Sequence, residues 1–190
     1  MPRIPPVEPT AEPEELRTVF DQLRATRGRI PTMYGILAHQ PEILAAHRAY
    51  FHAALDTGTL PRAFKEKVAF KVALECGSAY STASHRRYAL RHGVTEEELA
   101  AIERSEYGGL APHEQVALEF ADEVVRGALT SDATFQTLRT HFSSPEIVEF
   151  AALVGIMQLA STLGAIFDLQ PDADEGPPPV STIPPARGIV

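Results

Sequence analysis

The distribution of proline divides this chain of 190 residues into a middle and two ends. Five of the sixteen prolines lie in residues 1–13, and six lie in residues 171–190. Because proline has no backbone N–H and restricts the residue before it, we expect both ends to be extended, without helix or strand. The sequence therefore predicts a Pro-rich N-terminal arm over 1–13, one folded domain over 14–170, and a Pro-rich C-terminal tail over 171–190 that is mobile or wraps a neighbouring subunit.

Helical periodicity fills the stretch between these two ends. Apolar residues recur at helical spacing in segment after segment, and no alternating stretch typical of a β-strand is present. A capping box at 95–98 marks the start of one of these helices. The patterns predict an all-α bundle of about seven to eight helices, over 14–26, 41–55, 61–76, 80–92, a segment from 95, 112–125, 131–141 and 144–167.

The last of these segments is nearly all apolar from Phe150 to Ile166, so we expect it to be buried on several sides. One small domain is not expected to cover such a helix with its other helices alone. The apolar helix and the Pro-rich tail therefore favour a homo-oligomer.

The amino-acid composition argues against several classes of binding partner and site. Seventeen Lys and Arg against 25 Asp and Glu give a net charge of −8, which argues against nucleic acid and against an anionic membrane surface. The single cysteine, Cys76, excludes a disulfide within the chain and a Cys-rich metal site. With no apolar run that approaches the about 20 residues of a membrane span and no signal-peptide pattern, we expect a soluble, cytoplasmic protein.

Common catalytic and metal motifs are missing from the sequence. It has no Gly-rich phosphate loop, no GxSxG elbow, no HExxH and no EF-hand loop. The seven histidines do not form an i, i+4 pair, so no metal site is predicted. His47 and His52 are expected at the surface or at an interface.

One stretch, residues 60–95, carries residues suited to acid–base chemistry. Ser78, Ser81, His85 and Tyr88 follow one another at i, i+3, i+7 and i+10, which places them on one face of a helix. A turn near Gly77 would bring the preceding helix alongside that face, antiparallel to it.

The preceding helix carries Glu66 on a stripe shared with Ala69 and Ala73, and small residues there would let the second helix come close. Glu66 would then lie opposite His85, and a carboxylate beside an imidazole makes a general acid or base near neutral pH. The alternative for each residue is an ordinary one: Glu66 lies between two lysines and could be solvated, and His85 precedes two arginines and could be a surface residue.

This stretch resembles the carboxymuconolactone decarboxylase and AhpD-like alkylhydroperoxidase superfamily. The family core has a glutamate on one helix, a C-x-x-C pair that opens the next helix twelve residues later, and a histidine four residues after the second cysteine. Glu66, Ser78, Ser81 and His85 occupy these positions here, and the resemblance covers most of residues 15–170. It implies an AhpD-like helical bundle in a single domain, and an oligomer that is a trimer, a hexamer or a dimer.

The two cysteine positions hold serine, which departs from the thiol-dependent branch of the family. Serine offers neither a thiolate nucleophile nor a resolving thiol for peroxide reduction. Natural loss of the cysteines and an engineered Cys-to-Ser pair are both open. The resemblance is closest to the cysteine-less branch, which uses no cofactor and works by proton transfer.

The resemblance therefore implies a cofactor-independent lyase or isomerase acting on a small organic acid, lactone or carbonyl compound by decarboxylation, elimination or isomerisation. His85 would be the general acid or base and Glu66 would orient it. Ser78, Ser81, Tyr80 and Tyr88 would contact the substrate. Two alternatives remain: an AhpD-like peroxidase relative that is redox-inactive, and a non-catalytic scaffold that binds a small molecule. For the enzyme, we expect Glu66 and His85 to approach within about 3–6 Å inside a pocket, with the glutamate ionised.

Overall fold

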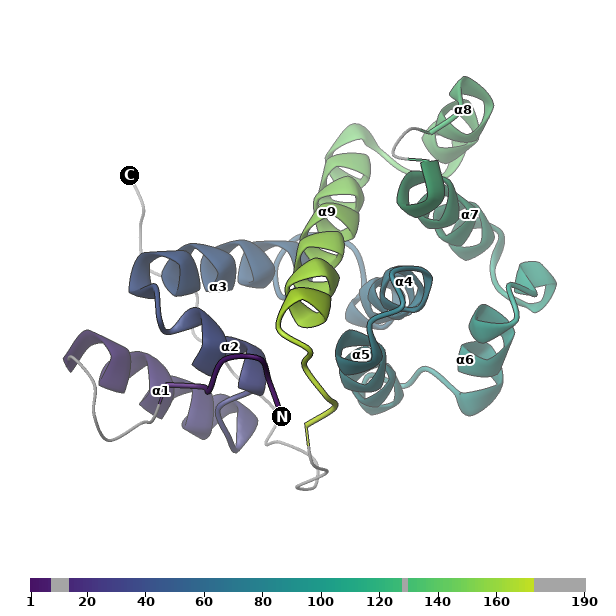
Figure 1. The fold of residues 1–190 in the computed structure, drawn as a ribbon. Coiled ribbons are helices and arrows are strands. Elements are labelled where there is room, and N and C mark those ends of the chain that lie inside the picture. The colour runs from purple at the N-terminus through teal and green to yellow at the C-terminus, as the bar shows by residue number, and fades with distance from the viewer. Residues whose placement is uncertain (8–13, 128–129, 173–190) are drawn as a thin grey trace.

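The computed structural model describes residues 1–7, 14–127 and 130–172, and within these ranges it contains helices and no strand (Figure 1). The prediction of an all-α fold is confirmed. The elements are α1 (Glu14–Arg27), α2 (Thr32–Leu37), α3 (Pro41–Leu55), α4 (Arg62–Glu75), α5 (Ala79–Arg91), α6 (Glu96–Glu103), the 3-10 turn η1 (Tyr107–Gly109), α7 (Pro112–Gly127), α8 (Asp132–His141) and α9 (Ser144–Ile166).

The expected helix count was slightly low, because α2 was not anticipated. It has six residues, fewer than two turns, so it is too short for its periodicity to be recognised. The anticipated helix start at Thr95 is present: the Thr95 side chain accepts a hydrogen bond from the Glu98 N–H, and Glu98 accepts one from the Thr95 N–H. Gly77 turns the chain between α4 and α5 with a φ of +65°, a conformation that favours glycine.

Helix α4 is the centre of the larger part of the molecule. Figure 1 shows it beside α5, with α9 on one side and α6 and α7 on the other, and α4 contacts all four of these helices. Ten consecutive residues of α4, from Phe64 to Ala73, are buried, so the helix is enclosed on every side.

All three lysines of the protein, Lys65, Lys67 and Lys71, lie in this enclosed segment. A buried ammonium group needs a partner, and each lysine finds acidic groups, most of them on a neighbouring helix. The partners are Glu149 of α9 for Lys65, Glu98 of α6 and Glu114 of α7 for Lys67, and Glu75 of α4 and Asp122 of α7 for Lys71. The lysines therefore tie α4 to the helices that surround it.

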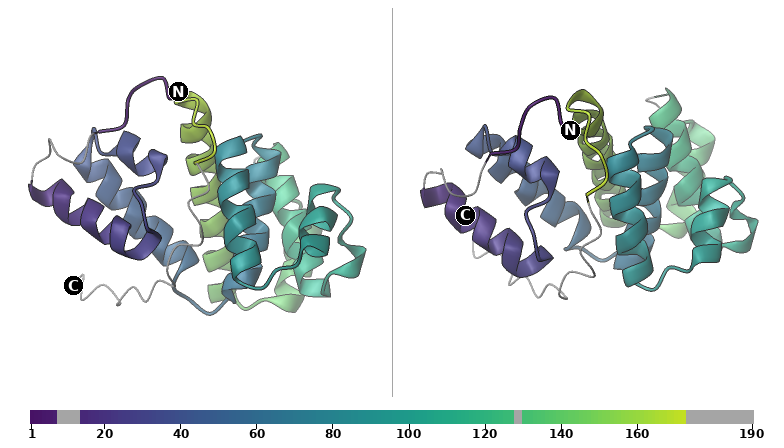
Figure 2. Two further views of the ribbon diagram at one scale, coloured as in Figure 1. Left: turned by 90° about the horizontal axis from the view of Figure 1, so that it is seen from below. Right: turned by 60° about the horizontal axis from the view of Figure 1, so that its bottom comes forward.

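Helix α9 separates two groups of helices (Figure 2): α1–α3 lie on one side of it and α4–α8 on the other. With 23 residues, α9 is also the one helix in the described part of the chain that is long and apolar enough to cross a membrane. A helix over 144–167 was expected, but an apolar run of membrane-spanning length was not. Core helices meet the same test, and α9 packs against α3, α4, α5 and α8.

The outward side of α9 carries the large apolar side chains Val148, Leu159 and Ile166, which are about half exposed or more. We call these three residues the α9 strip.

Both ends of the domain are held by contacts within the same chain. Residues 1–7 contain no helix or strand, and the Arg3 N–H donates to the carbonyl of Phe167, 2.9 Å away. At the other end, Asp172 accepts a hydrogen bond from Tyr80 at 3.1 Å and pairs with Arg29. The tail was expected to be mobile or to wrap a neighbouring subunit; its described residue Asp172 contacts Tyr80 and Arg29 of its own chain. The remainder of the predicted arm and tail, residues 8–13 and 173–190, lies outside the described residues.

Candidate active site

The α4–α5 hairpin brings Glu66 and His85 into contact. His85 Nδ1 lies 2.8 Å from Glu66 Oε2, and both side chains are buried. The stripe of small residues on α4 gives the physical reason, since Ala69 and Ala73 are fully buried and allow α5 to pack closely. The two side chains are thus within hydrogen-bond reach, slightly closer than the about 3–6 Å expected from the sequence, and their catalytic roles stay a prediction.

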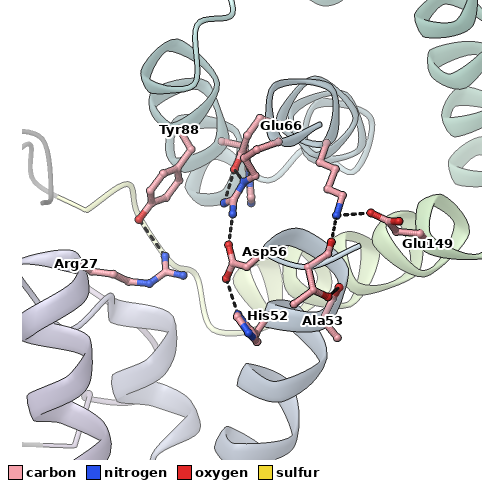
Figure 3. A network of polar contacts seen from close by, with 11 residues as sticks. Arg27, His52, Ala53, Asp56, Glu66, Tyr88 and Glu149 are labelled. Atoms are coloured by element: carbon pink, nitrogen blue, oxygen red, sulfur yellow. Dashed lines mark hydrogen bonds and ion pairs between the residues drawn. The ribbon is translucent and has the colours of Figure 1, made fainter. Parts of the chain in front are cut away.

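A chain of charged groups extends from this pair toward α3 (Figure 3). Arg62 Nε donates to Glu66 Oε1 at 2.7 Å, and the same guanidinium binds Asp56. The other carboxylate oxygen of Asp56 lies 3.0 Å from Nδ1 of His52. Glu66 is therefore held through one oxygen by Arg62 and through the other by His85, which fixes its orientation.

The charges around Glu66 determine its protonation state. Burial by itself would raise the pKa of this carboxyl group, because it disfavours the charged form. The adjacent His85 and Arg62 outweigh burial and hold the pKa of Glu66 below its ordinary value. Glu66 is therefore a carboxylate at neutral pH, and its contact with His85 requires Nδ1 of the imidazole to carry a hydrogen.

A pocket opens beside His85. Residues of α1, α2, α3, α4, α5 and α9 line it, together with the segment that follows α9. The lining includes charged, polar and aromatic side chains, among them those of Arg27, Tyr34, His47, Phe51, Arg62, Tyr80, Ser81, His85, Tyr88 and Asp172. Both groups of helices meet here, so the pocket lies at the junction of the two parts of the fold.

Tyr80 and Tyr88 both line this pocket, and each is already hydrogen bonded. The Tyr80 hydroxyl donates to Asp172 and accepts from the Met33 N–H, 3.3 Å away. Burial and the nearby Asp172 raise the pKa of Tyr80, so it stays a neutral phenol. The Tyr88 hydroxyl accepts from Arg27 at 2.9 Å (Figure 3).

The two serines at the family's cysteine positions, Ser78 and Ser81, have different surroundings. The Ser78 side chain caps α5 by accepting a hydrogen bond from the Ser81 N–H at 3.2 Å, and it lies against Gly164 of α9. Ser78 is not among the residues that line the pocket, so we do not include it among substrate contacts below. Ser81 lines the pocket beside His85.

Among the pocket residues that were not recognised from the sequence as part of the site, three carry polar or charged groups of interest: Arg62, Arg27 and His47. Arg62 could have been found, because it lies four residues before Glu66 and so on the same helix face. Arg27 carries no local signal. His47 was expected at the surface or at an interface, but only 7% of it is exposed, and it lines the pocket.

The thiol of Cys76 is remote from this chemistry. Cys76 follows the end of α4, is partly exposed and does not line the pocket. Burial raises the pKa of the Cys76 thiol, which lowers its thiolate fraction. Within the described ranges, no group of three His, Cys, Asp or Glu side chains is arranged to hold a metal ion.

Comparison with known structures confirms the fold. An uncharacterized peroxidase-related protein from Ralstonia eutropha JMP134 with an alkylhydroperoxidase AhpD core superposes with a TM-score of 0.83, over 91% of this chain and 93% of that one, at 20% identity. The debrominase Bmp8, solved with 2,3,4-tribromopyrrole, gives a TM-score of 0.79 over 90% of this chain and 92% of its own, also at 20% identity. A putative antioxidant defence protein AhpD of Agrobacterium tumefaciens gives 0.67 over 72% of this chain and 95% of that one, at 24% identity.

Sequence comparison gives the family. The carboxymuconolactone decarboxylase family model matches residues 41–123, a segment that contains Glu66, Ser81 and His85. An uncharacterized protein of Cupriavidus necator is 33% identical over 81 residues, which are 42% of this chain and 72% of that protein. The chain therefore belongs to the carboxymuconolactone decarboxylase family and has the AhpD-like fold.

Proposed function

We propose that this protein is a cofactor-independent acid–base enzyme, a lyase or isomerase that acts on a small organic acid, lactone or carbonyl compound. The observation that carries the proposal is the buried Glu66–His85 pair at the wall of a pocket. His85 is the general acid or base, and Glu66 is a positioning residue that acts through it.

We assign a different role to each nitrogen of the imidazole. Nδ1 carries a hydrogen that is held by the Glu66 carboxylate, so Nε2, on the other side of the ring, has the free lone pair. Nε2 can take a proton from a carbon next to a carbonyl group, and the ionised Glu66 stabilises the imidazolium that forms. Ser81 and Tyr88, which line the same pocket, are the proposed substrate contacts from α5, and Tyr80 forms part of the wall.

Three reaction outcomes follow from one proton-transfer group. In an isomerisation, His85 removes a proton from carbon, the electron pair moves into an enolate, and His85 then returns the proton at another carbon. In an elimination, His85 removes a proton from carbon, and the electron pair expels a leaving group. In a decarboxylation, the C–CO₂ bond breaks, the electron pair stays on the substrate as an enolate, and a protonated His85 supplies the proton to carbon. Arg62, whose charge faces Glu66 in the pocket wall, helps to keep Glu66 ionised throughout.

The proposal is tested by ¹H NMR in D₂O with a panel of β-keto acids, unsaturated lactones and α,β-unsaturated acids. We expect the protein to catalyse loss of carbon-bound ¹H signals or release of CO₂ from at least one member. His85→Gln should abolish this, whereas His141→Gln, at an exposed position at the end of α8, should leave it unchanged. Ligand binding without turnover by the wild-type protein would instead indicate the non-catalytic binder, and activity retained in His85→Gln would overturn the assigned role.

A further inference from the structure

His47 is a buried histidine without a hydrogen-bond partner. Neither ring nitrogen, Nδ1 or Nε2, has one among the described residues, although the side chain is more than nine-tenths buried and lines the pocket. Buried polar groups in proteins are nearly always hydrogen bonded, because leaving one unpaired costs free energy. Desolvation lowers the pKa of His47, so its ring is neutral, with one donor and one acceptor nitrogen.

Arg27 is a pocket cation that forms no direct ion pair among the described residues, although the Asp56 carboxylate is near enough to favour its charge. Its guanidinium donates to the Tyr88 hydroxyl and lies 5.8 Å and 5.6 Å from the ring centres of Tyr34 and Tyr88. Arg62, in contrast, is paired with Glu66 and Asp56. Among the ion pairs of the described residues, none involves Arg27, and a guanidinium at such a site is suited to a carboxylate.

Aromatic rings connect these two groups along the pocket wall. Tyr34 contacts His47, His47 stacks on Phe51, Phe51 contacts His85, and His85 contacts Tyr88, with successive ring centres 5.8–6.4 Å apart. All five rings line the pocket. A continuous aromatic wall favours a flat ligand with a π system, which can stack against it or meet it edge to face.

We propose that the pocket binds a flat, conjugated or aromatic monocarboxylic acid with a second polar group on its ring, the carboxylate on Arg27 and the second polar group on His47. This inference rests on the proposed function in that it names the substrate class of the same pocket. One carboxylate is specified because Arg27 has no direct carboxylate contact among the described residues, whereas Arg62 already contacts two acidic groups. A hydroxyl or carbonyl oxygen would satisfy His47, since a neutral imidazole both donates and accepts.

Calorimetric titration measures this binding separately from catalysis. The probes are benzoate, 3-hydroxybenzoate, 4-hydroxybenzoate, 4-hydroxybenzamide and trans-4-hydroxycyclohexanecarboxylate, each titrated up to about 10 mM, the range where weak pocket ligands register. The charge-neutral amide tests the carboxylate, the saturated ring tests flatness, and plain benzoate tests the second polar group. We expect the better of the two hydroxybenzoates to bind at least about tenfold more tightly than the amide or the saturated acid, and about threefold more tightly than benzoate.

Variants assign each preference to its residue. Arg27→Gln should remove the preference for acid over amide, whereas Arg24→Gln, one turn earlier on α1 and about half exposed, should keep it. His47→Phe should remove the preference for hydroxybenzoate over benzoate and keep the preference for acid over amide. The Phe variant should also unfold at an equal or higher temperature without ligand, because it deletes two unsatisfied buried nitrogens while retaining a ring of similar size. A purely structural role of His47 predicts a lower unfolding temperature instead.

The outcomes separate this inference from the proposed function. These preferences, measured by titration of the wild-type protein, would support the ligand class even if no turnover is found with it. Equal binding of acid and amide, equal binding of the flat and saturated rings, or no binding of any probe would overturn the ligand class, whether or not His85-dependent catalysis of another compound is observed.

Discussion

Nδ1 of His85 and Oε2 of Glu66 lie 2.8 Å apart in the interior, where Glu66 is completely buried. A carboxylate at such a depth is stable only with close cationic and hydrogen-bonding partners. Arg62 supplies the cation, and His85 contacts the other carboxylate oxygen. His85, Glu66 and Arg62 therefore form one electrostatic unit across α4 and α5.

Glu66→Gln should destabilise the protein by about 3–5 kcal/mol at pH 7.5, measured by urea unfolding, because it removes the buried carboxylate that binds His85 and one of the two carboxylates that pair with Arg62. The variant should also lose part of the pH dependence of the free energy of unfolding. Since the pKa of Glu66 is lowered in the folded state, its stabilising contribution is present above the ordinary value of 4.5 and is lost as the pH falls through the folded value.

The free energy of unfolding of the wild-type protein should therefore fall more steeply below about pH 4.5 than that of Glu66→Gln. Glu97→Gln is the matched control, since Glu97 is exposed on α6, and its effect should stay within about 0.5 kcal/mol. Equal stability of wild type and Glu66→Gln across this pH range would contradict the interpretation of Glu66 as a buried carboxylate.

Peroxide reduction with a dithiol donor should be absent. The chain has a single thiol, Cys76, whose pKa is raised by burial and which does not line the pocket. Without a resolving thiol, a sulfenic acid at Cys76 could not be recycled within the chain. Consumption of tert-butyl hydroperoxide with dithiothreitol should equal that of Cys76→Ala and of buffer, and turnover that scales with wild-type protein and disappears in Cys76→Ala would refute this prediction.

The α9 strip, Val148, Leu159 and Ile166, should be covered by another copy of the chain. Val148 is 68% exposed, and an apolar strip of this length on one helix favours association in water. Light scattering at micromolar concentration should give a trimer, a hexamer or a dimer. Leu159→Glu should reduce the mass toward that of the monomer. Phe135→Glu, which adds the same charge to an exposed apolar position of α8, should leave the mass unchanged. A monomeric wild-type protein would rule the assembly out.

The sequence predicted those parts of the site that depend on local geometry. Glu66 and His85 lie on consecutive helices joined at Gly77, so helical periodicity and one turn are enough to place them opposite each other. Arg27 and His47 could not be predicted in this way. They reach the pocket only because α1–α3 pack across α9 from the rest of the domain, and no local pattern encodes that arrangement.

Burial was the other property that the sequence did not reveal. The Lys65-Glu66-Lys67 run has the composition of a solvated helix face, yet all three side chains are at most 5% exposed. The cause is tertiary: α5, α6, α7 and α9 surround α4, and acidic residues on these helices and within α4 pair with its lysines. The apolar residues at the other positions of α4 are typical of such an enclosed helix.

The enclosure of α4 leads to a last prediction, on amine reactivity. Lys65, Lys67 and Lys71 are the only lysines, with 1%, 5% and 1% of their surface exposed, whereas Met1 at the N-terminus is fully exposed. Burial favours the neutral amine, but the ion pairs with acidic groups outweigh it and raise the pKa of Lys67 and Lys71, which reduces the nucleophilic fraction further. A brief treatment of the native protein with an acetylating ester should therefore modify the N-terminal amine alone, as read by peptide mass spectrometry. The same treatment in guanidinium chloride should modify the three lysines as well, and rapid acetylation of any lysine in the native protein would show that α4 is not enclosed.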